Sequence, residues 1–327
     1  MTMTLQTTMM AAVDDRLVPG VSWAHLKGKR QTMQVYGGSQ WQPTPKPLHA
    51  GMLYDLASLT KVVGTTPLFL QALAAGKVAL DTSIATWLPA FTQPTTFRQA
   101  LTHTSGLAGY IPHCDELAAP ALKQALLTQL TTTVEVDQKV AYHDVNLLLV
   151  GWALEAMYQA PVQDLITQRV LHPMHLAQAT FAPDAANSVP TTYSERLGLR
   201  AGLVHDPKSA TLGEHSGAAG LFASLDDLIT FAQVMLGQRT TSAFHTPWPE
   251  ELMHDYTKNQ LGRSLGWDLR TGRGGLWLYH TGYTGTFMLL SPQLQEALIV
   301  LTNRVHPTVN PDFLPWRDAL IAKFIGE

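Results

Sequence analysis

The sequence predicts an α+β protein in which both ends of the chain build one sheet and a mostly helical segment is inserted between them. Strand-like patterns occur at residues 20–37 and again at 260–303. Between them, residues 81–200 carry several apolar patterns with a helical period. Charged residues make up only 14% of the 327 residues, which excludes a coiled coil, an acidic tail and a charge-rich disordered chain.

The N-terminal elements are read from apolar runs and the turn residues between them. Residues 21–26 and 32–36 favour two strands, and 27–29 contain a glycine that can form the turn. A helical pattern follows over 58–75, and Gly76 is placed to end it. Pro67 lies inside this pattern and predicts a kink or a break, because proline has no N–H to donate.

The rest of the chain separates into a helical middle and a strand-rich end. Helical patterns are expected at 82–88, 118–131, 145–158 and 162–170. Short strands are expected at 265–269, 276–280, 286–291 and 297–301, and a terminal helix at 315–325. Because the sheet uses both ends, we expect a single unit over 1–327. Residues 1–75 and 205–327 would form its α/β lobe, and 76–204 a mostly helical lobe.

Composition excludes several classes of function. The near-balance of 22 basic and 25 acidic residues, a net charge of −3, predicts no nucleic-acid partner. A single cysteine, Cys114, excludes an internal disulfide. No apolar run reaches the roughly 18 residues of a membrane helix. The N-terminus lacks a basic start and a long apolar segment, so we expect no signal peptide and a cytoplasmic location. The oligomeric state stays open.

Common motifs for nucleotides, metals and hydrolysis are absent from the sequence. It contains no G-x-S-x-G, no G-x-x-x-x-G-K-[ST], no G-x-G-x-x-G and no H-E-x-x-H. His172 and His175 lie three residues apart, but an intervening proline and the lack of a nearby carboxylate argue against a metal site. We therefore expect no metal and no cofactor.

One short motif at the start of the 58–75 helix carries chemistry. Ser58-Leu59-Thr60-Lys61 is an S-x-x-K, and residues three apart share one helix face, so the amine can reach the hydroxyl. The free N–H groups and positive dipole at the helix start favour a negatively charged oxygen at Ser58 and a neutral Lys61 that can accept a proton. The alternative is a chance match in which Ser58 only caps the helix.

Two further motifs follow in a characteristic order. Tyr142-His143-Asp144 precedes the helical pattern at 145–158, and His280-Thr281-Gly282 follows a predicted strand. With the S-x-x-K they match S-x-x-K, Y-x-[ND] and [KH]-T-G. The chain thereby resembles the serine hydrolases that include class C β-lactamases, penicillin-binding D-alanyl-D-alanine carboxypeptidases, D-aminopeptidases and β-lactamase-like esterases. The resemblance runs from about residue 15 to the end and also covers the segments 54–57, 101–107 and 216–228.

The resemblance implies a fold and a set of roles. The fold would be β-lactamase/transpeptidase-like, with a central antiparallel sheet flanked by helices, an inserted helical lobe and an active site at the lobe junction. Ser58 would be the acylated nucleophile, Lys61 would help to deprotonate it, and Tyr142 would transfer protons. The backbone N–H groups of Ser58 and Tyr283 would form the oxyanion hole. The substrate-binding residues would be Asp144, His280, Thr281 and Gly282.

Plainer roles remain open for several of these residues. Tyr142 could pack in the core, Asp144 could cap the following helix, and His280 could be structural. Residues 103–105 look like a structural turn. Four aromatic residues are cleft-lining candidates that could equally pack in the core or at the rim: Tyr54, Tyr110, Trp267 and Tyr283.

Two departures from the β-lactamase pattern bear on the substrate. His280 stands where β-lactamases have lysine, and imidazole with a pKa of about 6.5 is mostly neutral at pH 7. Asp144 replaces the usual asparagine and adds a negative charge. Both departures weaken the binding of an anionic substrate. We therefore expect a serine hydrolase acting on a small ester or amide, as an esterase or a D-amino-acid peptidase, with weak or no β-lactamase activity. The alternatives are a penicillin-binding or sensor-type protein that is acylated at Ser58 but turns over poorly, and a catalytically silent scaffold.

Overall fold

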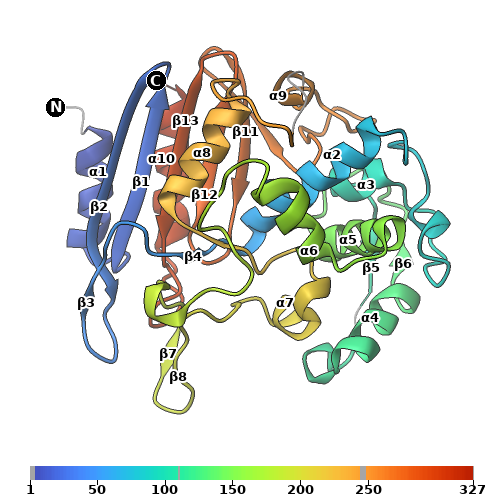
Figure 1. The fold of residues 1–327 in the computed structure, drawn as a ribbon, viewed down its shortest axis with the longest axis horizontal. Coiled ribbons are helices and arrows are strands. Elements are labelled where there is room, and N and C mark those ends of the chain that lie inside the picture. Colours follow the sequence, from blue (N-terminus) through green and yellow to red (C-terminus); the bar gives the residue numbers. More distant parts are fainter. Residues whose placement is uncertain (1–3, 110, 244–247, 327) are drawn as a thin grey trace.

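A seven-stranded sheet forms the centre of the molecule and uses strands from both ends of the chain (Figure 1). The computed structural model describes residues 4–109, 111–243 and 248–326. Every pairing in the sheet is antiparallel, and the strand order is β10-β11-β12-β13-β1-β2-β3. The strands are β1 (Gly20–Lys27), β2 (Arg30–Gln40), β3 (Lys46–Pro47), β10 (Asp268–Gly272), β11 (Gly275–Thr281), β12 (Phe287–Ser291) and β13 (Glu296–Thr302).

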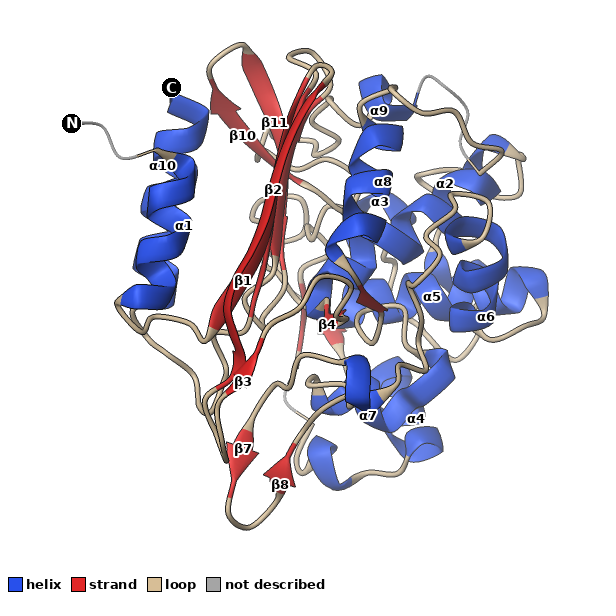
Figure 2. Cartoon of the chain, turned by 60° about the vertical axis from the view of Figure 1, so that its left-hand side comes forward, coloured by secondary structure: helices blue, strands red, loops and turns tan. Residues whose placement is uncertain are grey.

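Two helices cover one face of this sheet (Figure 2). They are α1 (Leu5–Asp14) and α10 (Phe313–Gly326), one from each end of the chain. Alternate side chains of the strands pack beneath them, such as Leu298 and Val300 of β13. The intervening Ile299 and Leu301 belong to the core on the other face. All seven residues of β13 are buried, as expected for a central strand covered on both sides.

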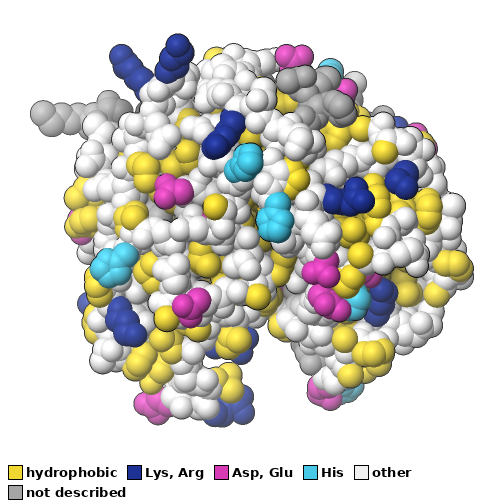
Figure 3. Space-filling model, in the orientation of Figure 1, with side chains coloured by type: hydrophobic (Ala, Val, Ile, Leu, Met, Phe, Trp, Pro, Cys, Tyr) yellow, Lys and Arg dark blue, Asp and Glu magenta, His cyan; other side chains and the backbone are white. Residues whose placement is uncertain are grey.

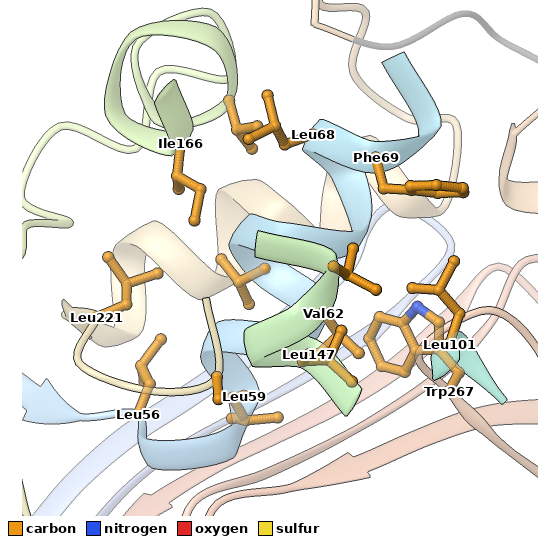
Figure 4. Packing of buried hydrophobic residues seen from close by; sticks show 14 of the residues in the cluster. Leu56, Leu59, Val62, Leu68, Phe69, Leu101, Leu147, Ile166, Leu221 and Trp267 are labelled. Carbon is orange, nitrogen blue, oxygen red and sulfur yellow. The ribbon is translucent and has the colours of Figure 1, made fainter. Parts of the chain in front are cut away.

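The other face carries the larger core and most of the helices. They are α2 (Thr66–Ala74), α3 (Phe97–Leu101), α4 (Ala119–Thr128), α5 (Val145–Tyr158), α6 (Val162–Ile166), α7 (Pro207–Leu212), α8 (Leu225–Met235) and α9 (Trp248–Glu251). Figure 4 shows part of this core, where Val62, Leu147 and Trp267 pack together. Short two-stranded pairs complete the fold: β4 (Tyr54–Asp55) with β9 (Phe222–Ala223), β5 (Leu107–Ala108) with β6 (Thr131–Thr132), and β7 (Tyr193–Ser194) with β8 (Gly198–Leu199).

The helical pattern at 58–75 is a composite of three segments. A 3₁₀ turn covers Ala57–Leu59, a wide π-helical turn covers Lys61–Thr65, and α2 follows. Pro67 lies in the first turn of α2, where its missing N–H leaves no helical bond unmade. The break that Pro67 predicted is therefore confirmed. Gly76 ends α2 with φ +67°, and the bonds Lys77 N–H to Ala72 O and Gly76 N–H to Leu73 O close a Schellman motif.

Several elements differ from the boundaries that the sequence predicts. Residues 82–88 form only the 3₁₀ turn Ile84–Thr86. The strand expected at 265–269 begins at Asp268, because Gly266 turns the chain with φ +79°. The helices α1, α3, α7, α8 and α9 were not predicted. The side chain of Thr4 caps α1, and the threonine-rich composition of its first turns weakens the helical signal.

Candidate active site

Ser58 follows a strained turn that Asp55 holds in place. Ala57 has φ +45°, a left-handed conformation that residues other than glycine rarely adopt. The buried Asp55 carboxylate accepts the N–H of Ala57 at 2.8 Å and that of His205 at 2.7 Å. Burial raises the pKa of Asp55 to about 6, against the lowering effect of these two hydrogen bonds. The turn leaves Ser58 half-buried at the surface of a pocket.

Lys61 approaches Ser58 from below the pocket and is fully buried. Its Nζ lies 2.8 Å from Ser58 Oγ, 2.6 Å from Asp144 Oδ1 and 2.8 Å from the Ala218 carbonyl. These three acceptors match the three N–H donors of an ammonium group.

The charge state of Lys61 follows from these contacts. Burial alone lowers the pKa of Lys61, but the interactions with Tyr142 and Asp144 outweigh it and leave the pKa above its ordinary value. The neutral amine expected from the position of Lys61 at a helix start is therefore wrong, because the carboxylate of Asp144 holds the lysine in its charged form.

Asp144 is the N-cap residue that precedes α5, yet its side chain caps no helical N–H. It binds Lys61 instead, and the side chain is 34% exposed. Burial raises the pKa of Asp144, but the neighbouring Lys61 ammonium outweighs this and leaves the pKa below its ordinary value. The sequence left open whether Asp144 caps α5 or takes part in the site. In the structure its side chain contacts Lys61 and caps no helical N–H.

Tyr142 lies across the pocket, with its ring between two histidines. Its ring stacks on His103 with centroids 4.3 Å apart, and the ring of His280 lies 6.1 Å away. Lys61 Nζ is 5.4 Å from the Tyr142 ring centroid. Tyr142 is 44% exposed, so it is a pocket residue and not a core aromatic.

Both histidines beside Tyr142 are buried and neutral. Burial lowers the pKa of His103 and of His280 well below the ordinary value. His280 Nδ1 lies 3.0 Å from the Thr281 carbonyl, which requires a proton on Nδ1. The carbonyl of His103 also accepts the N–H of Ala141 at 2.9 Å, so the turn at 103–105 holds the Tyr142 segment as well.

The end of β11 packs directly against the Ser58 turn. A side chain at Gly282 would collide with the Leu56 carbonyl and with Thr286 Oγ1. Glycine is therefore required at position 282 because the backbone of Leu56 packs closely against it. Thr284 Oγ1 and Thr286 Oγ1 also donate to the carbonyls of Asp55 and Leu56, at 2.8 and 3.1 Å.

The backbone N–H groups of Ser58 and Tyr283 donate to no acceptor among the described residues. Both residues line the pocket. Tyr283 is held from behind by Arg304, whose Nε donates to the Tyr283 carbonyl at 2.7 Å and whose guanidinium lies 4.4 Å from the ring centroid.

The pocket has a volume of about 450 Å³ and lies between the end of β11 and the first residues of α5 and α7. Five of the predicted site residues line it: Ser58, Tyr142, Asp144, Thr281 and Tyr283. Lys61 reaches Ser58 from beneath, while His280 and Gly282 are not part of the lining. Ala57 and Ala219, which also line the pocket, belong to the segments 54–57 and 216–228 that the resemblance covers. The sequence did not indicate the remaining lining residues, which are His205, Asp206 and Pro207.

The two other aromatic candidates that the structure describes do not line the pocket. Tyr54 and Trp267 are buried, with Tyr54 Oη 2.9 Å from Ser22 Oγ, and Tyr110 lies outside the described residues. Charged side chains are scattered over the face seen in Figure 3 without a large patch of one sign. Within the described ranges, no group of three or more His, Cys, Asp or Glu is placed to hold a metal, and no helix is long and apolar enough to cross a membrane.

Comparison with known proteins agrees with this geometry. A family profile described as Beta-lactamase matches residues 5–323. An N-acetylmuramyl-L-alanine amidase of Bacillus subtilis (strain 168) is 24% identical over 94% of this chain and 79% of its own length. A putative D-alanyl-D-alanine carboxypeptidase of Escherichia coli (strain K12) is 24% identical over 92% of this chain and 79% of its own.

Solved structures share the fold. EstCE1, a hydrolase with promiscuous acyltransferase activity, superposes with a TM-score of 0.78, at 19% identity over 96% of this chain and 97% of that one. A β-lactamase/D-alanine carboxypeptidase from Pseudomonas syringae gives 0.77 at 17% identity, covering 97% of each chain. The predicted β-lactamase/transpeptidase-like fold is thus confirmed, and the chain belongs to the Beta-lactamase family.

Proposed function

We propose that this chain is a serine hydrolase that cleaves a small ester or amide through an acyl-enzyme on Ser58. One observation carries the proposal: Lys61 Nζ lies 2.8 Å from Ser58 Oγ and is held there by Asp144, at the base of a pocket that Tyr142 also lines. A nucleophile within hydrogen-bond reach of a group that a third residue orients is the general arrangement of nucleophilic catalysis.

The charged state of Lys61 assigns the proton transfers to Tyr142. A protonated lysine has no free electron pair, so it stabilises negative charge on Ser58 Oγ instead of accepting its proton. Tyr142 would accept that proton as Oγ bonds to the substrate carbonyl carbon. It would return the proton to the leaving group as the ester or amide bond breaks. In the second half of the reaction Tyr142 would take a proton from water as the water oxygen bonds to the acyl carbon. It would then give this proton to Ser58 Oγ as the bond between Oγ and the acyl carbon breaks.

The free amides of Ser58 and Tyr283 support an oxyanion hole. Both residues line the pocket, and neither N–H has an acceptor among the described residues, so both would be available to the carbonyl oxygen of a substrate. A donor in such a position typically contributes about 2.7–4 kcal/mol to the transition state. The Arg304 contact behind Tyr283 would keep its amide in place.

The charges of the pocket favour a substrate without a carboxylate at the reacting end. Its described lining contains two carboxylates, Asp144 and Asp206, and no lysine or arginine. His280, at the position where a lysine would hold an anion, is neutral and lies behind the lining. We therefore propose an esterase or a D-amino-acid peptidase with weak or no β-lactamase activity.

Hydrolysis of p-nitrophenyl acetate tests the proposal. The wild type should turn over, and Ser58→Ala should reduce the rate to the background of the buffer. Ser242→Ala, an exposed serine remote from the pocket, is the matched control and should keep the wild-type rate. Undiminished turnover in Ser58→Ala would refute the assignment of the nucleophile.

A second candidate is favoured by one observation, the carboxylate of Asp144 beside the reacting groups. Its negative charge could slow deacylation and leave a penicillin-binding or sensor-type protein. Intact-mass spectrometry after incubation with a β-lactam separates the two. A persistent adduct on Ser58 with little ester turnover supports the sensor, whereas fast ester turnover without an adduct supports the hydrolase.

A further inference from the structure

His103 ends α3 at a position where glycine is the usual residue. The N–H of His103 donates to the Ala100 carbonyl at 3.2 Å, and that of Thr104 donates to the Gln99 carbonyl at 2.9 Å. These two bonds close a Schellman motif, and His103 takes its left-handed position with φ +56°. Glycine would form the same turn without strain, so the turn alone does not account for a histidine here.

The side chain of His103 is buried, and its partners fix the place of its proton. The Ser105 hydroxyl donates to Asn146 Oδ1 at 2.7 Å, which turns the Asn146 amide N–H toward His103 Nδ1 at 3.2 Å. Nδ1 of the neutral imidazole is therefore an acceptor, and the proton is on Nε2. Nε2 is buried without a partner among the described residues. Neither the strained backbone nor this unpaired N–H stabilises the fold.

Three groups of His103 contact three successive residues of the segment that carries Tyr142. The His103 carbonyl accepts the Ala141 N–H at 2.9 Å, and Nδ1 accepts the His143 N–H at 3.4 Å. Between them the His103 ring stacks on Tyr142, with centroids 4.3 Å and planes 29° apart, whereas the His280 ring lies 6.1 Å away. Tyr142 belongs to no helix or strand and is 44% exposed, so its position depends on such contacts.

We propose that His103 is a positioning residue of the hydrolytic reaction: its buried imidazole, held by Asn146, is the surface against which the Tyr142 ring stacks, and this keeps the Tyr142 hydroxyl directed at Ser58 and Lys61. The inference rests on the function proposed above. His103 is fully buried and does not line the pocket, so it touches no substrate. A proton passes only between atoms within hydrogen-bond reach, so a ring that tilts away should slow the chemical steps and leave substrate binding unchanged.

His103→Asn removes the ring, while asparagine tolerates the left-handed backbone and keeps an oxygen acceptor. In hydrolysis of p-nitrophenyl acetate we expect kcat to fall by about 10- to 100-fold, with KM close to the wild-type value. His103→Phe keeps a flat ring and should recover most of the lost kcat. His175→Asn is the matched control, because His175 is an exposed histidine with φ +58° that does not line the pocket. It should leave kcat and KM unchanged.

A double-mutant cycle with Tyr142→Phe separates positioning of the hydroxyl from a general disturbance of the pocket. Tyr142→Phe removes the hydroxyl itself, so His103→Asn should cause no further loss of kcat in that background. An equal loss with and without the hydroxyl would overturn the inference, and so would an unchanged kcat in His103→Asn. Wild-type turnover in Tyr142→Phe would instead contradict the proton transfers of the proposed function, and with them the inference.

Proton NMR of Tyr142 gives a readout that does not depend on turnover. The ring signals of Tyr142 are identified by their loss in Tyr142→Phe. Because the His103 ring stacks on them, they should shift in His103→Asn and much less in His103→Phe, where a ring still faces them. Unshifted signals in His103→Asn would contradict the stack.

Asn146→Leu tests the same contact without changing the residue in the turn, and it decides the inference if His103→Asn does not fold. The variant removes the N–H that holds His103 Nδ1, so the ring should lose its fixed orientation. We expect a smaller loss of kcat than in His103→Asn, and no loss in the Tyr142→Phe background. An equal loss in both backgrounds would overturn the inference.

Discussion

Lys61 connects three parts of the chain that are far apart in the sequence. Its ammonium group joins the Ser58 turn, the start of α5 at Asp144 and the loop at Ala218. A buried ammonium group that lost one of these acceptors would keep an unsatisfied donor, which costs free energy. The site is therefore also a structural junction, and changes to its charged residues should affect stability as well as activity.

Asp144→Asn should show this coupling. The variant keeps an oxygen acceptor but loses the negative charge, so we expect the free energy of unfolding to fall by about 1–3 kcal/mol. Because a third of the Asp144 side chain is exposed, solvent screening places the value toward the lower end. Urea unfolding at pH 7 measures it. Asp15→Asn, an exposed aspartate at the end of α1, is the control and should change stability by less than about 0.5 kcal/mol.

The difference in stability between wild type and Asp144→Asn should depend on pH at both extremes. The pKa of Asp144 lies below its ordinary 3.8, so its contribution is present above that value and is lost as the pH falls through the folded-state pKa. The pKa of Lys61 lies above its ordinary 10.5, so its contribution is lost as the pH rises through the folded-state pKa. A difference that disappears already at pH 6–8 would contradict the ion pair.

Single residues of the site could be predicted from the sequence where they belong to a motif. Ser58 and Lys61 were found because a spacing of three residues brings them to one face at the start of a helix, and Asp144 was found through the resemblance of residues 142–144 to a family motif. His103 was taken for a turn residue, and its turn is real, but its stacking on Tyr142 joins residues 39 positions apart.

At the scale of elements, the turn between β11 and β12 holds the Ser58 segment in place. Gly282 packs against Leu56, and the two threonine hydroxyls that follow bind the carbonyls of Asp55 and Leu56. The strained Ala57 conformation is thus fixed from outside its own segment, as expected for a turn that persists only when its surroundings impose it.

Gly282→Ala should disturb this contact. The added methyl group would meet the Leu56 backbone, which cannot move aside as a flexible side chain can, so we expect destabilisation of about 1–3 kcal/mol and a fall in ester turnover. Gly326→Ala, at the end of α10 with open space around it, is the matched control. Thermal unfolding and turnover of the two variants are to be compared. Equal stability would contradict the close packing of β11 on the Ser58 turn.

Helices and strands were predictable where the apolar pattern was strong and the segment itself determined its conformation. The strands β1 and β11 to β13 follow alternating or continuous apolar runs, and their ends were found to within about one residue. The strand β2 was expected at 32–36 and is longer, Arg30–Gln40. The segment 82–88 has an apolar pattern but folds into a single 3₁₀ turn, since the Ile84 N–H bonds to the Thr95 carbonyl and not within a helix. Such a contact has no signature within the segment itself.

For the molecule as a whole, we propose that the α/β lobe and the helical lobe form one unit. The sheet takes strands from both ends of the chain, and the core on its helical face includes residues from β1, α2, α5 and β13. A core that crosses the proposed boundaries at 76 and 204 leaves neither lobe with a complete interior of its own.

A single unfolding transition is the corresponding prediction. Far-UV circular dichroism, tryptophan fluorescence and loss of ester turnover should report the same midpoint in urea, because tryptophans lie in both cores. The midpoints from the three probes should be compared under conditions in which unfolding is reversible. Two separated transitions would show that the lobes unfold independently, and the proposal of a single unit would then be wrong.

The pairing of β1 with β13 has a consequence for synthesis on the ribosome. Lys27 at the end of β1 lies opposite Glu296, so one edge of β1 stays without its partner until about 270 further residues have been made. At about 5–20 residues per second this takes roughly 14–54 s. During that interval an apolar strand edge is open to neighbouring nascent chains. Crowding of translating ribosomes, more than the stability of the finished fold, should therefore limit the yield of this protein.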